Sequence, residues 1–357
     1  MICQCLGGGK QAAEAVKAQP EVKKSTHVAE GVHSKLSKSA GFRKSVYVTR
    51  TIHEDALAIL EEKFNVHVWR SDHTVPREKM LQEVENVSAI VCTAADEIDD
   101  EILSAAGSSL KVICSMTSSL HHIDQEACRK RGIILHHVAD LCADAKAEYT
   151  IALLLVTCKR LIEGSDAVRK GEWHDWSPMW LCGADLKNKT LGFLGSGQVA
   201  YRMAKRLEGF EIARMLCYSS DSQDEQPEWK DVNVEKVEGA DQIFAESDFI
   251  VCDLPVTEET KNFVNKTNLS LCKPDCVLVN TSRPEVINQE DLLACLEEGT
   301  IGGAGLDVTT PEPLPPTHPL LEQPRCVITP HIGTATSATR RRKGIHLANT
   351  VVDMLLM

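Results

Sequence analysis

The chain of 357 residues is long enough for two domains, each with its own hydrophobic core. The net charge is −12, and residues 1–43 carry seven Lys and Arg against three Glu, so the rest of the chain is strongly acidic and is not expected to bind nucleic acid. No run approaches the roughly 20 apolar residues of a membrane span, and the N-terminus lacks the apolar core of a secretory signal. We therefore expect a cytoplasmic protein without a membrane partner; the basic leader leaves the mitochondrion as the alternative.

The chain contains fourteen cysteines and two adjacent histidine pairs that could suggest a metal site. Most cysteines lie in apolar runs, such as Val91-Cys92, where a thiol acts as a small hydrophobic group. No Cys-x-x-Cys pair occurs, which disfavours structural zinc and favours a reducing compartment. His121-His122 and His136-His137 are interpreted as non-ligands, because neighbours on an extended chain point to opposite faces. We predict no metal site.

The first half of the chain predicts a tail followed by a parallel α/β domain. Residues 1–43 are polar and show no sustained periodicity, which predicts a disordered N-terminal tail. Short apolar runs then alternate with amphipathic segments. Strands are predicted at 45–49, 65–69, 89–92, 111–115 and 133–136, and helices at 54–63, 76–85, 99–106 and 123–131. A single apolar helix over 145–164 and a Trp-rich loop over 173–180 follow.

A dinucleotide-binding turn begins the second half. The apolar strand predicted at 191–194 leads into Gly195-Ser-Gly-Gln-Val-Ala200 and then a helix over 201–208. Gly195 permits a tight turn, and Gly197 has no side chain to hold a pyrophosphate away from the backbone. The free N–H groups of the helix would face the phosphates. Such a turn alone is a weak signal, but strand, turn and helix together predict a dinucleotide site.

Further strands are predicted at 214–218, 249–253, 276–280, 303–306 and 326–329, with a helix over 288–298 among the segments between them. This alternation is typical of a doubly wound sheet, in which ligands bind at the carboxyl ends of the strands. Polar residues follow several strands, namely Arg283, Asp307, Glu312 and His331. Each alone has an ordinary structural explanation, but their shared location indicates a site.

Six short motifs of this region resemble the D-isomer-specific 2-hydroxyacid dehydrogenases in order and spacing. They are Gly195-Ser-Gly-Gln-Val-Ala200, Leu254-Pro-Val-Thr257, Asn280-Thr-Ser-Arg283, Gly305-Leu-Asp-Val308, Pro311-Glu-Pro313 and Pro330-His-Ile-Gly333. Within that family, the region around 173–183 is most similar to the glyoxylate/hydroxypyruvate reductases. The resemblance covers about 44–357. It implies a doubly wound Rossmann NAD(P)-binding domain (144–331) inserted in a flavodoxin-like α/β substrate domain (44–143 plus 332–357), with the active site in the cleft.

The chemistry of such an enzyme matches the polar strand ends. Reduction of a 2-oxo acid needs a hydride, a proton for the carbonyl oxygen and a cation for the carboxylate. His331 suits the proton donor because imidazole exchanges protons near neutrality, and Glu312 would hold its ring and favour imidazolium. Arg283 suits the cation because its planar fork can hold two oxygens together. The resemblance implies the same Arg–Glu–His set.

The resemblance also implies the residues that bind cofactor and substrate. The cofactor residues are Gly195, Gly197, Gln198, Val199, Ser219, Ser220, Asp221, Pro255, Thr281 and Asp307, and the substrate residues are Ser118, Ser119, Arg283, His331, Gly333 and Trp176. An NAD enzyme usually places an acid after the second strand, whereas hydroxyls stand here. NADP(H) is therefore favoured mildly over NAD(H), since Asp221 can still act as the missing acid.

Four departures from the family pattern surround the expected site. Ser118-Ser119 replaces a Val-Gly loop, Gln198 a phosphate-turn Arg, Pro284 a Gly and Lys146 a Thr near the nicotinamide. If the loop needs a positive φ, Ser119 would store on the order of 1 kcal/mol or more of strain. The departures leave open a weak or silent dinucleotide-binding relative with a regulatory role. A working reductase is favoured because the catalytic trio is complete.

Three of the five tryptophans lie in one loop, at Trp173, Trp176 and Trp180. Concentrated large aromatics are enriched where surfaces meet. Trp180 is expected to pack on the chain's own core. The resemblance implies that Trp176 crosses the interface of a homodimer built on 145–185 and limits the partner's substrate site to small oxo acids.

Overall fold

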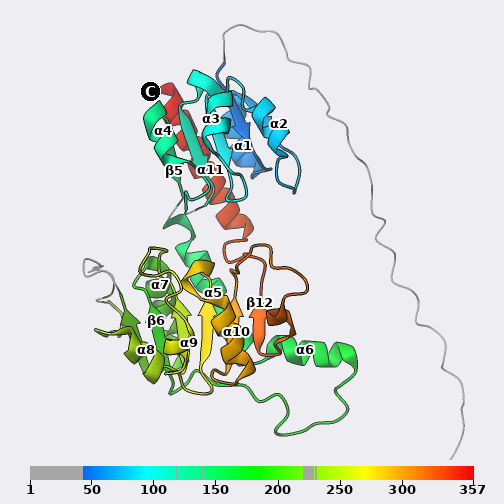
Figure 1. The fold of residues 1–357 in the computed structure, drawn as a ribbon, viewed down its shortest axis with the longest axis vertical. Helices are drawn as coiled ribbons and strands as arrows, with labels where there is room; N and C mark the ends of the chain where they lie inside the picture. Colours follow the sequence, from blue (N-terminus) through cyan, green and yellow to red (C-terminus); the bar gives the residue numbers. More distant parts are fainter. Residues whose placement is uncertain (1–42, 118, 139, 220–228, 230) are drawn as a thin grey trace, which may run out of the picture. The chain divides into compact units, whose positions relative to one another are not determined.

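The computed structural model describes residues 43–357, except 118, 139, 220–228 and 230 (Figure 1). The predicted N-terminal tail therefore lies almost wholly outside the described residues. Residues Arg43–Met357 form one compact unit. Among its described helices, none combines the length and the apolar character that crossing a bilayer requires.

The first sheet is a five-stranded parallel sheet with the order β2-β1-β3-β4-β5. This is the flavodoxin-like order, and it confirms the fold predicted for this half. Its strands are short apolar runs, and β3 and β4 are buried along their whole length, as expected for a sheet covered on both faces. The strands are β1 (Ser45–Val48), β2 (Asn65–Val68), β3 (Ala89–Cys92), β4 (Val112–Ser115) and β5 (Ile134–His137).

Helices cover both faces of this sheet. On one face α1 (Glu54–Lys63) packs against α11 (Ser337–Leu356), which brings the C-terminus back to the first sheet. The other face carries α2 (Arg77–Glu83), α3 (Asp100–Ala106) and α4 (Gln125–Arg131). Side-chain caps begin two of these helices: Asp99 accepts the N–H of Ile102, and Asp124 that of Ala127.

The second sheet has seven parallel strands in the order β12-β11-β10-β9-β6-β7-β8. The order reverses between β6 and β9, which is the switch point where doubly wound sheets bind ligands. The predicted Rossmann topology is therefore confirmed. The strands are β6 (Thr190–Leu194), β7 (Arg214–Tyr218), β8 (Glu235–Lys236), β9 (Phe249–Cys252), β10 (Val277–Asn280), β11 (Gly303–Leu306) and β12 (Cys326–Ile328).

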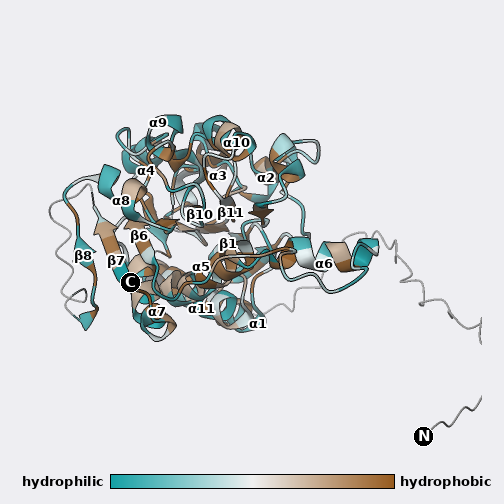
Figure 2. Ribbon diagram, turned by 90° about the horizontal axis from the view of Figure 1, so that it is seen from below, coloured by the Kyte–Doolittle hydropathy of each residue, from teal (hydrophilic) through white to brown (hydrophobic). Residues whose placement is uncertain are grey.

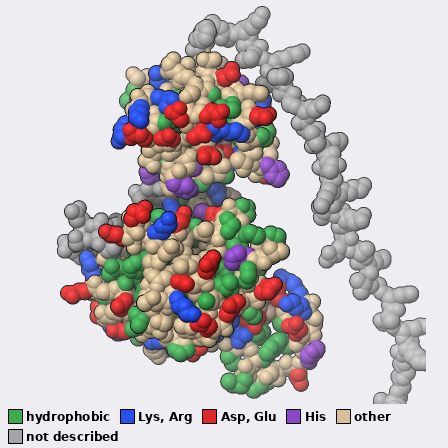
Figure 3. Space-filling view, viewed as in Figure 1, with side chains coloured by type: hydrophobic (Ala, Val, Ile, Leu, Met, Phe, Trp, Pro, Cys, Tyr) green, Lys and Arg blue, Asp and Glu red, His purple; other side chains and the backbone are tan. Residues whose placement is uncertain are grey.

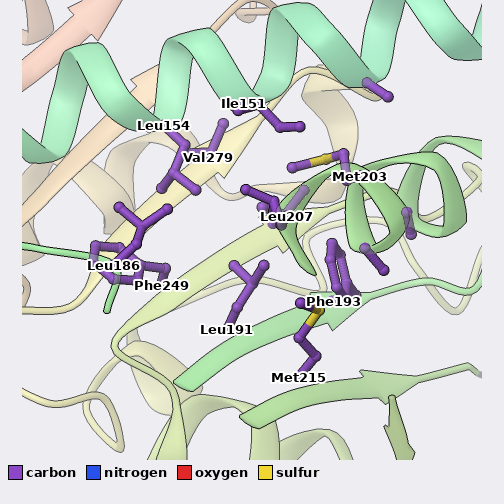
Figure 4. Packing of buried hydrophobic residues seen from close by; sticks show 14 of the residues in the cluster. Ile151, Leu154, Leu186, Leu191, Phe193, Met203, Leu207, Met215, Phe249 and Val279 are labelled. Atoms are coloured by element: carbon purple, nitrogen blue, oxygen red, sulfur yellow. The ribbon is translucent and has the colours of Figure 1, made fainter. Parts of the chain in front are cut away.

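Two helices cover one face of the second sheet and three cover the other. Figure 4 shows Ile151 and Leu154 of α5 (Ala143–Cys158) packed with Met203 and Leu207 of α7 (Gln198–Leu207) over the strands. The opposite face carries α8 (Ala240–Glu246), α9 (Lys266–Leu269) and α10 (Gln289–Glu297). Figure 2 shows β6 largely hydrophobic and α9 hydrophilic, as burial of the sheet requires.

The prediction of one long helix over 145–164 is wrong, because the structure has two helices there, α5 and α6 (Leu161–Lys170). Arg160 between them adopts a left-handed conformation, with φ of 55°. The returning chain causes the break: the N–H of Ala184 binds the carbonyl of Cys158 at 2.9 Å, and a Cβ on Gly183 would lie 2.3 Å from the same oxygen. A tertiary contact thus takes the acceptor that a continuous helix would use.

The other predicted helices and strands are present, with ends that differ by a residue or two, or by three at the start of α7. The sequence prediction did not name β8, α8 or α9. The two sheets fall within the predicted substrate and cofactor domains, while the boundaries at 143 and 331 stay predictions.

Candidate active site

The glycine turn lies at the carboxyl end of β6, at the switch point of the second sheet. Gly195 has φ of 114°, and a Cβ there would lie 2.4 Å from the carbonyl oxygen of Asp253. A Cβ on Gly197 would lie 2.7 Å from the Asp253 carboxylate. Both glycines are therefore required by the backbone itself, before any ligand is considered.

The turn leads into a helix N-terminus suited to a pyrophosphate. Gly197 is the N-cap of α7 and provides no side-chain cap, and Gln198 and Val199 form the first turn. Trp229 supports the turn from the side, since its indole N–H donates to the carbonyl of Ser196 at 3.0 Å. Sequence reasoning missed Trp229, which follows a segment without periodicity. These residues fit a dinucleotide, whose phosphates would meet the N–H groups and positive end of α7.

Most of the other predicted cofactor residues also lie at strand ends. Ser219 directly follows β7, and the carbonyl of Tyr218 accepts the N–H of Gly195 at 2.8 Å, so this strand end adjoins the turn. Pro255 lies in an exposed loop after β9, where its carbonyl accepts the Thr260 hydroxyl at 2.6 Å. Ser220 and Asp221 lie outside the described residues. Their part in cofactor choice stays a prediction.

Sequence reasoning also missed Asp253, which follows β9 directly. Its carboxylate accepts the N–H of Ala200 in the first turn of α7 at 3.2 Å. Burial raises the pKa of Asp253, although Lys146, the Ala200 N–H and Arg283 act in the opposite direction. In the sequence, only the position of Asp253 directly after a predicted strand could have indicated a place near the site. A negative charge beside a phosphate-binding turn is not expected there.

Glu312 and His331 form a hydrogen-bonded pair, with 3.0 Å between the Glu312 Oε2 and the His331 Nδ1. Their side chains are 37% and 55% exposed, so both remain accessible. Burial opposes ionisation of Glu312, but the hydrogen bond and charge of His331 and the Thr309 N–H outweigh it, and the pKa of Glu312 lies below its usual value. When Nδ1–H donates to the carboxylate, Nε2 is left available for a second hydrogen bond.

Asp307 fixes the loop that carries His331. Its carboxylate accepts the N–H groups of Ile332 at 2.9 Å and Gly333 at 2.7 Å, together with the Thr329 hydroxyl at 2.8 Å. His331 itself has φ of 53°, a left-handed conformation that costs a non-glycine residue of order 1 kcal/mol. The hydrogen bonds to the buried carboxylate offset this strain locally. The predicted cofactor contact of Asp307 stays a prediction.

Arg283 lies three residues beyond β10 and is half-buried. Asn280 shapes its loop: the amide of Asn280 donates to the Arg283 carbonyl at 2.8 Å and accepts the Ser282 N–H at 2.9 Å. Thr281 meets Thr150 of α5, with their hydroxyl oxygens 2.7 Å apart. Pro284 begins a short 3-10 helix, a position that suits its fixed φ, so this departure is accommodated by the fold.

The predicted substrate loop follows β4. Ser118 lies outside the described residues. The φ of Ser119 depends on the position of Ser118, so the strain expected at Ser119 stays a prediction. Its hydroxyl lies 2.8 Å from His121 Nδ1, and its carbonyl accepts the Thr117 hydroxyl at 2.7 Å. Among the described residues, no hydrogen bond links Ser119 to the Arg–Glu–His trio.

His122 anchors this loop to the core. Its Nε2 lies 3.2 Å from the Ser115 hydroxyl, which in turn lies 3.0 Å from that of Thr117. Burial and the charge of His121 lower the pKa of His122 to about 4, so the ring is neutral at physiological pH. Both histidines of the pair thus hydrogen-bond within the loop and its supporting strand.

Trp176 lies in the loop after α6, together with Trp173 and Met179. These side chains are 80%, 62% and 81% exposed. Trp180 is 41% exposed, so its predicted packing on the core is wrong. Figure 3 shows hydrophobic side chains gathered over α6 and this loop. An apolar surface of this kind is typical of a region that meets another protein.

A doubly wound sheet with a glycine turn at its switch point is typical of dinucleotide-binding proteins, which include the nicotinamide-dependent oxidoreductases. The comparisons with known proteins narrow this class. The family described as D-isomer specific 2-hydroxyacid dehydrogenase, NAD binding domain, matches residues 151–333. The chain belongs to this family of enzymes.

Several relatives carry one activity in their names. The glyoxylate reductase/hydroxypyruvate reductase of Mus musculus is 38% identical over 309 residues, which cover 86% of this chain and 93% of the mouse protein. The glyoxylate reductase of Pyrococcus furiosus is 35% identical over 319 residues, or 87% of this chain and 92% of that protein. The crystal structure of a protein from Thermus thermophilus matches with a TM-score of 0.81 and 35% identity, covering 87% and 96% of the two chains. The chain is therefore an enzyme for NAD(P)-dependent reduction of 2-oxo acids.

Proposed function

We propose that this protein reduces glyoxylate and hydroxypyruvate to their 2-hydroxy acids, with His331 as the proton donor. The observation that carries this proposal is the 3.0 Å hydrogen bond between His331 and Glu312, on an accessible loop at the carboxyl end of the sheet. Relatives at 35–38% identity carry these substrates in their names.

The roles of the side chains follow from their chemistry. The bound nicotinamide supplies the hydride. Glu312 accepts the Nδ1–H of His331, which orients the ring and stabilises imidazolium, so that Nε2–H can donate to the developing alkoxide. Arg283 would hold the substrate carboxylate and polarise its carbonyl through its two-pronged guanidinium. Backbone N–H groups near Ser118 and Ser119, together with Gly333, would complete the substrate site.

Turnover by the purified protein tests this proposal. NADPH consumption would be followed by its near-ultraviolet absorbance with glyoxylate and hydroxypyruvate, and with a bulkier 2-oxo acid for comparison. We expect turnover of the first two. Cofactor binding without turnover would instead support the second candidate, a silent relative with a binding or regulatory role, which rests on the departures at Ser118-Ser119, Gln198, Lys146 and Pro284.

The cofactor preference is a separate part of the proposal. Ser219 follows β7 next to the turn, at the position where an acid would hold the ribose of NAD. We expect kcat/KM to be a few-fold higher with NADPH than with NADH, because a hydroxyl does not repel a 2′-phosphate. A strong preference for NADH would show that Asp221 holds the ribose.

We also infer a homodimer built on 145–185. Its support is the exposed apolar surface of α6 and the following loop, where Leu161, Val168 and Trp176 are 54%, 55% and 80% exposed. Sedimentation at micromolar concentration should show a dimer. Trp176→Ala should then admit bulkier 2-oxo acids while the dimer persists, and a wild-type monomer would refute the role given to Trp176. A cytoplasmic location stays a prediction, with the mitochondrion as the alternative.

A further inference from the structure

Asp253 caps helix α7 from outside that helix. Gly197, the N-cap residue of α7, has no side chain that could cap it. The carboxylate of Asp253, which directly follows β9, accepts the N–H of Ala200 in the first turn at 3.2 Å. The same Oδ2 would lie 2.7 Å from a Cβ on Gly197. Such an acid stabilises a helix, because it satisfies an N–H group and complements the positive end of the dipole.

The backbone of Asp253 is held against the glycine turn. Its N–H donates to the carbonyl of Leu194, at the end of β6, at 2.7 Å. A Cβ on Gly195 would lie 2.4 Å from the Asp253 carbonyl oxygen, so the two segments are in close contact. Aspartate has a single carbon between its backbone and its carboxylate, so the charge stays beside the turn in any rotamer. The carboxylate is therefore a fixed part of this helix end.

The same helix end has to accept the anionic part of a dinucleotide. The NAD-binding domain that matches 151–333 places the pyrophosphate at the N-terminus of the helix that follows the glycine turn. A carboxylate there offsets the positive potential of α7 and repels a second anion. Asp99 and Asp124 cap α3 and α4 in the same way, but no ligand is expected at those helices. At α7, stabilising the helix and binding the cofactor are in conflict.

The ionisation of Asp253 depends on groups from several elements. Burial raises the pKa of its carboxyl, whereas Lys146 of α5, a backbone N–H of α7 and Arg283 beyond β10 act in the opposite direction. Burial also raises the pKa of the neighbouring Cys252 thiol, so that thiol is neutral, and residues 198–200 have no ionisable side chain. A phosphate beside the carboxylate would raise the pKa of Asp253 further. The protein should therefore take up a proton when a dinucleotide binds.

We propose that Asp253 sets the cofactor affinity of this protein, because its carboxylate caps the end of α7 that the cofactor phosphates need. The carboxylate stabilises the helix in the free protein, opposes the dinucleotide on binding and gains a proton as the dinucleotide binds. The proposal rests on the dinucleotide binding of the family and is independent of the substrate proposed above. Its test measures affinity and proton uptake, so its failure differs from a failure of turnover.

Calorimetry on the purified full chain tests the proposal, with NADH and ADP-ribose as ligands. The pyrophosphate of both stays ionised near neutrality, so proton uptake reports on the protein. Asp253→Asn keeps an oxygen that can accept the Ala200 N–H and removes the charge. At pH 8 it should bind both ligands about tenfold more tightly than the wild type, because one charge repulsion is gone. Heats measured in two buffers of different ionisation enthalpy should show proton uptake by the wild type and none by the variant.

Asp124→Asn is the matched control, because Asp124 caps α4 through the Ala127 N–H at 2.8 Å, away from the glycine turn. We expect unchanged affinity and proton uptake for this variant. Thermal unfolding without ligand shows whether both variants are folded. Equal or weaker binding by folded Asp253→Asn would overturn the proposal, because the carboxylate would then support the turn or hold the cofactor. Binding without proton uptake by the wild type, which needs no variant, would also refute it.

Discussion

The carboxyl ends of the strands differ between the two sheets, although both sheets are parallel and covered by helices on both faces. At the first sheet, the buried Asp96 accepts the Thr49 hydroxyl at 2.5 Å and the Thr93 N–H at 2.8 Å, and Arg50 lies 3.2 Å from it. The polar groups there bind one another. At the second sheet, Glu312 and His331 keep 37% and 55% of their side-chain surface exposed.

This difference distinguishes an internally bonded polar network around Asp96 from an exposed pair of ionisable groups at Glu312 and His331. The polar groups around Asp96 in the first sheet bind one another and hold the loops after β1 and β3 in place. The second sheet leaves the charged groups of Glu312 and His331 exposed, where we propose that they meet the substrate. Because both sheets are parallel and covered by helices, the two sets of strand ends differ mainly in the side chains that follow the strands. Substitutions at the strand ends of the first sheet should therefore have other consequences than substitutions at those of the second.

The largest effect should follow His331→Ala in the second sheet. Loss of the proton donor should lower kcat for glyoxylate reduction by roughly 10²- to 10⁴-fold, the usual contribution of general acid catalysis. NADPH affinity should change little, since the turn at Gly195 is untouched. Steady-state kinetics and calorimetry measure the two effects. Turnover near that of the wild type would exclude His331 as the donor.

Substitution of His122 in the first sheet should change the stability of the protein and leave Arg283, Glu312 and His331 unchanged. The pKa of His122 is lowered to about 4 by burial and by His121, whereas an unfolded histidine titrates near 6.5. The contribution of the neutral His122 ring to the free energy of unfolding is therefore fully present above pH 6.5 and is lost as the pH falls toward 4. Between pH 7 and pH 5 the free energy of unfolding should fall by about 2 kcal/mol through this residue.

Urea unfolding of His122→Gln at the two pH values checks this expectation. The variant should be less stable than the wild type at pH 7, and its loss of stability between pH 7 and pH 5 should be smaller by the same amount. His174→Gln is the control, because His174 lies in the exposed loop after α6. An unchanged slope in His122→Gln would show that the buried ring does not govern the acid response.

Arg283→Lys should be milder than loss of the proton donor. Lysine keeps the charge but cannot hold two oxygens in one plane, so kcat/KM should fall by about ten- to a hundredfold, with contributions from both KM and kcat. Arg325→Lys, at an exposed arginine before β12, should have no effect. Equal kinetics for Arg283→Lys and the wild type would show that Arg283 does not need to hold two substrate oxygens at once.

Much of this arrangement could be predicted from the sequence. The strands are short apolar runs, and burial on both faces of a parallel sheet leaves little choice of residue. The proximity of Glu312 and His331 could be predicted because both follow strands, and the carboxyl ends of parallel strands meet at one edge; their catalytic roles stay predictions. Glu312 and His331 are 19 residues apart in sequence and in direct contact in the structure.

The features that could not be predicted depend on contacts between distant segments. The helix over 145–164 has a continuous helical pattern, and only the returning chain at Ala184 shows why it ends at Cys158. Asp253 resembles any polar strand end until its contact with Ala200 is seen.

The central claim is that Glu312 acts through His331 at the edge of the second sheet, and a double-mutant cycle tests it most directly. Glu312→Gln alone should lower kcat/KM for glyoxylate by about tenfold and move the loss of activity at high pH to lower pH, because imidazolium loses its carboxylate partner. In the His331→Ala background, the same substitution should have no further effect. An equal tenfold loss in both backgrounds would contradict the account, because Glu312 would then act without His331.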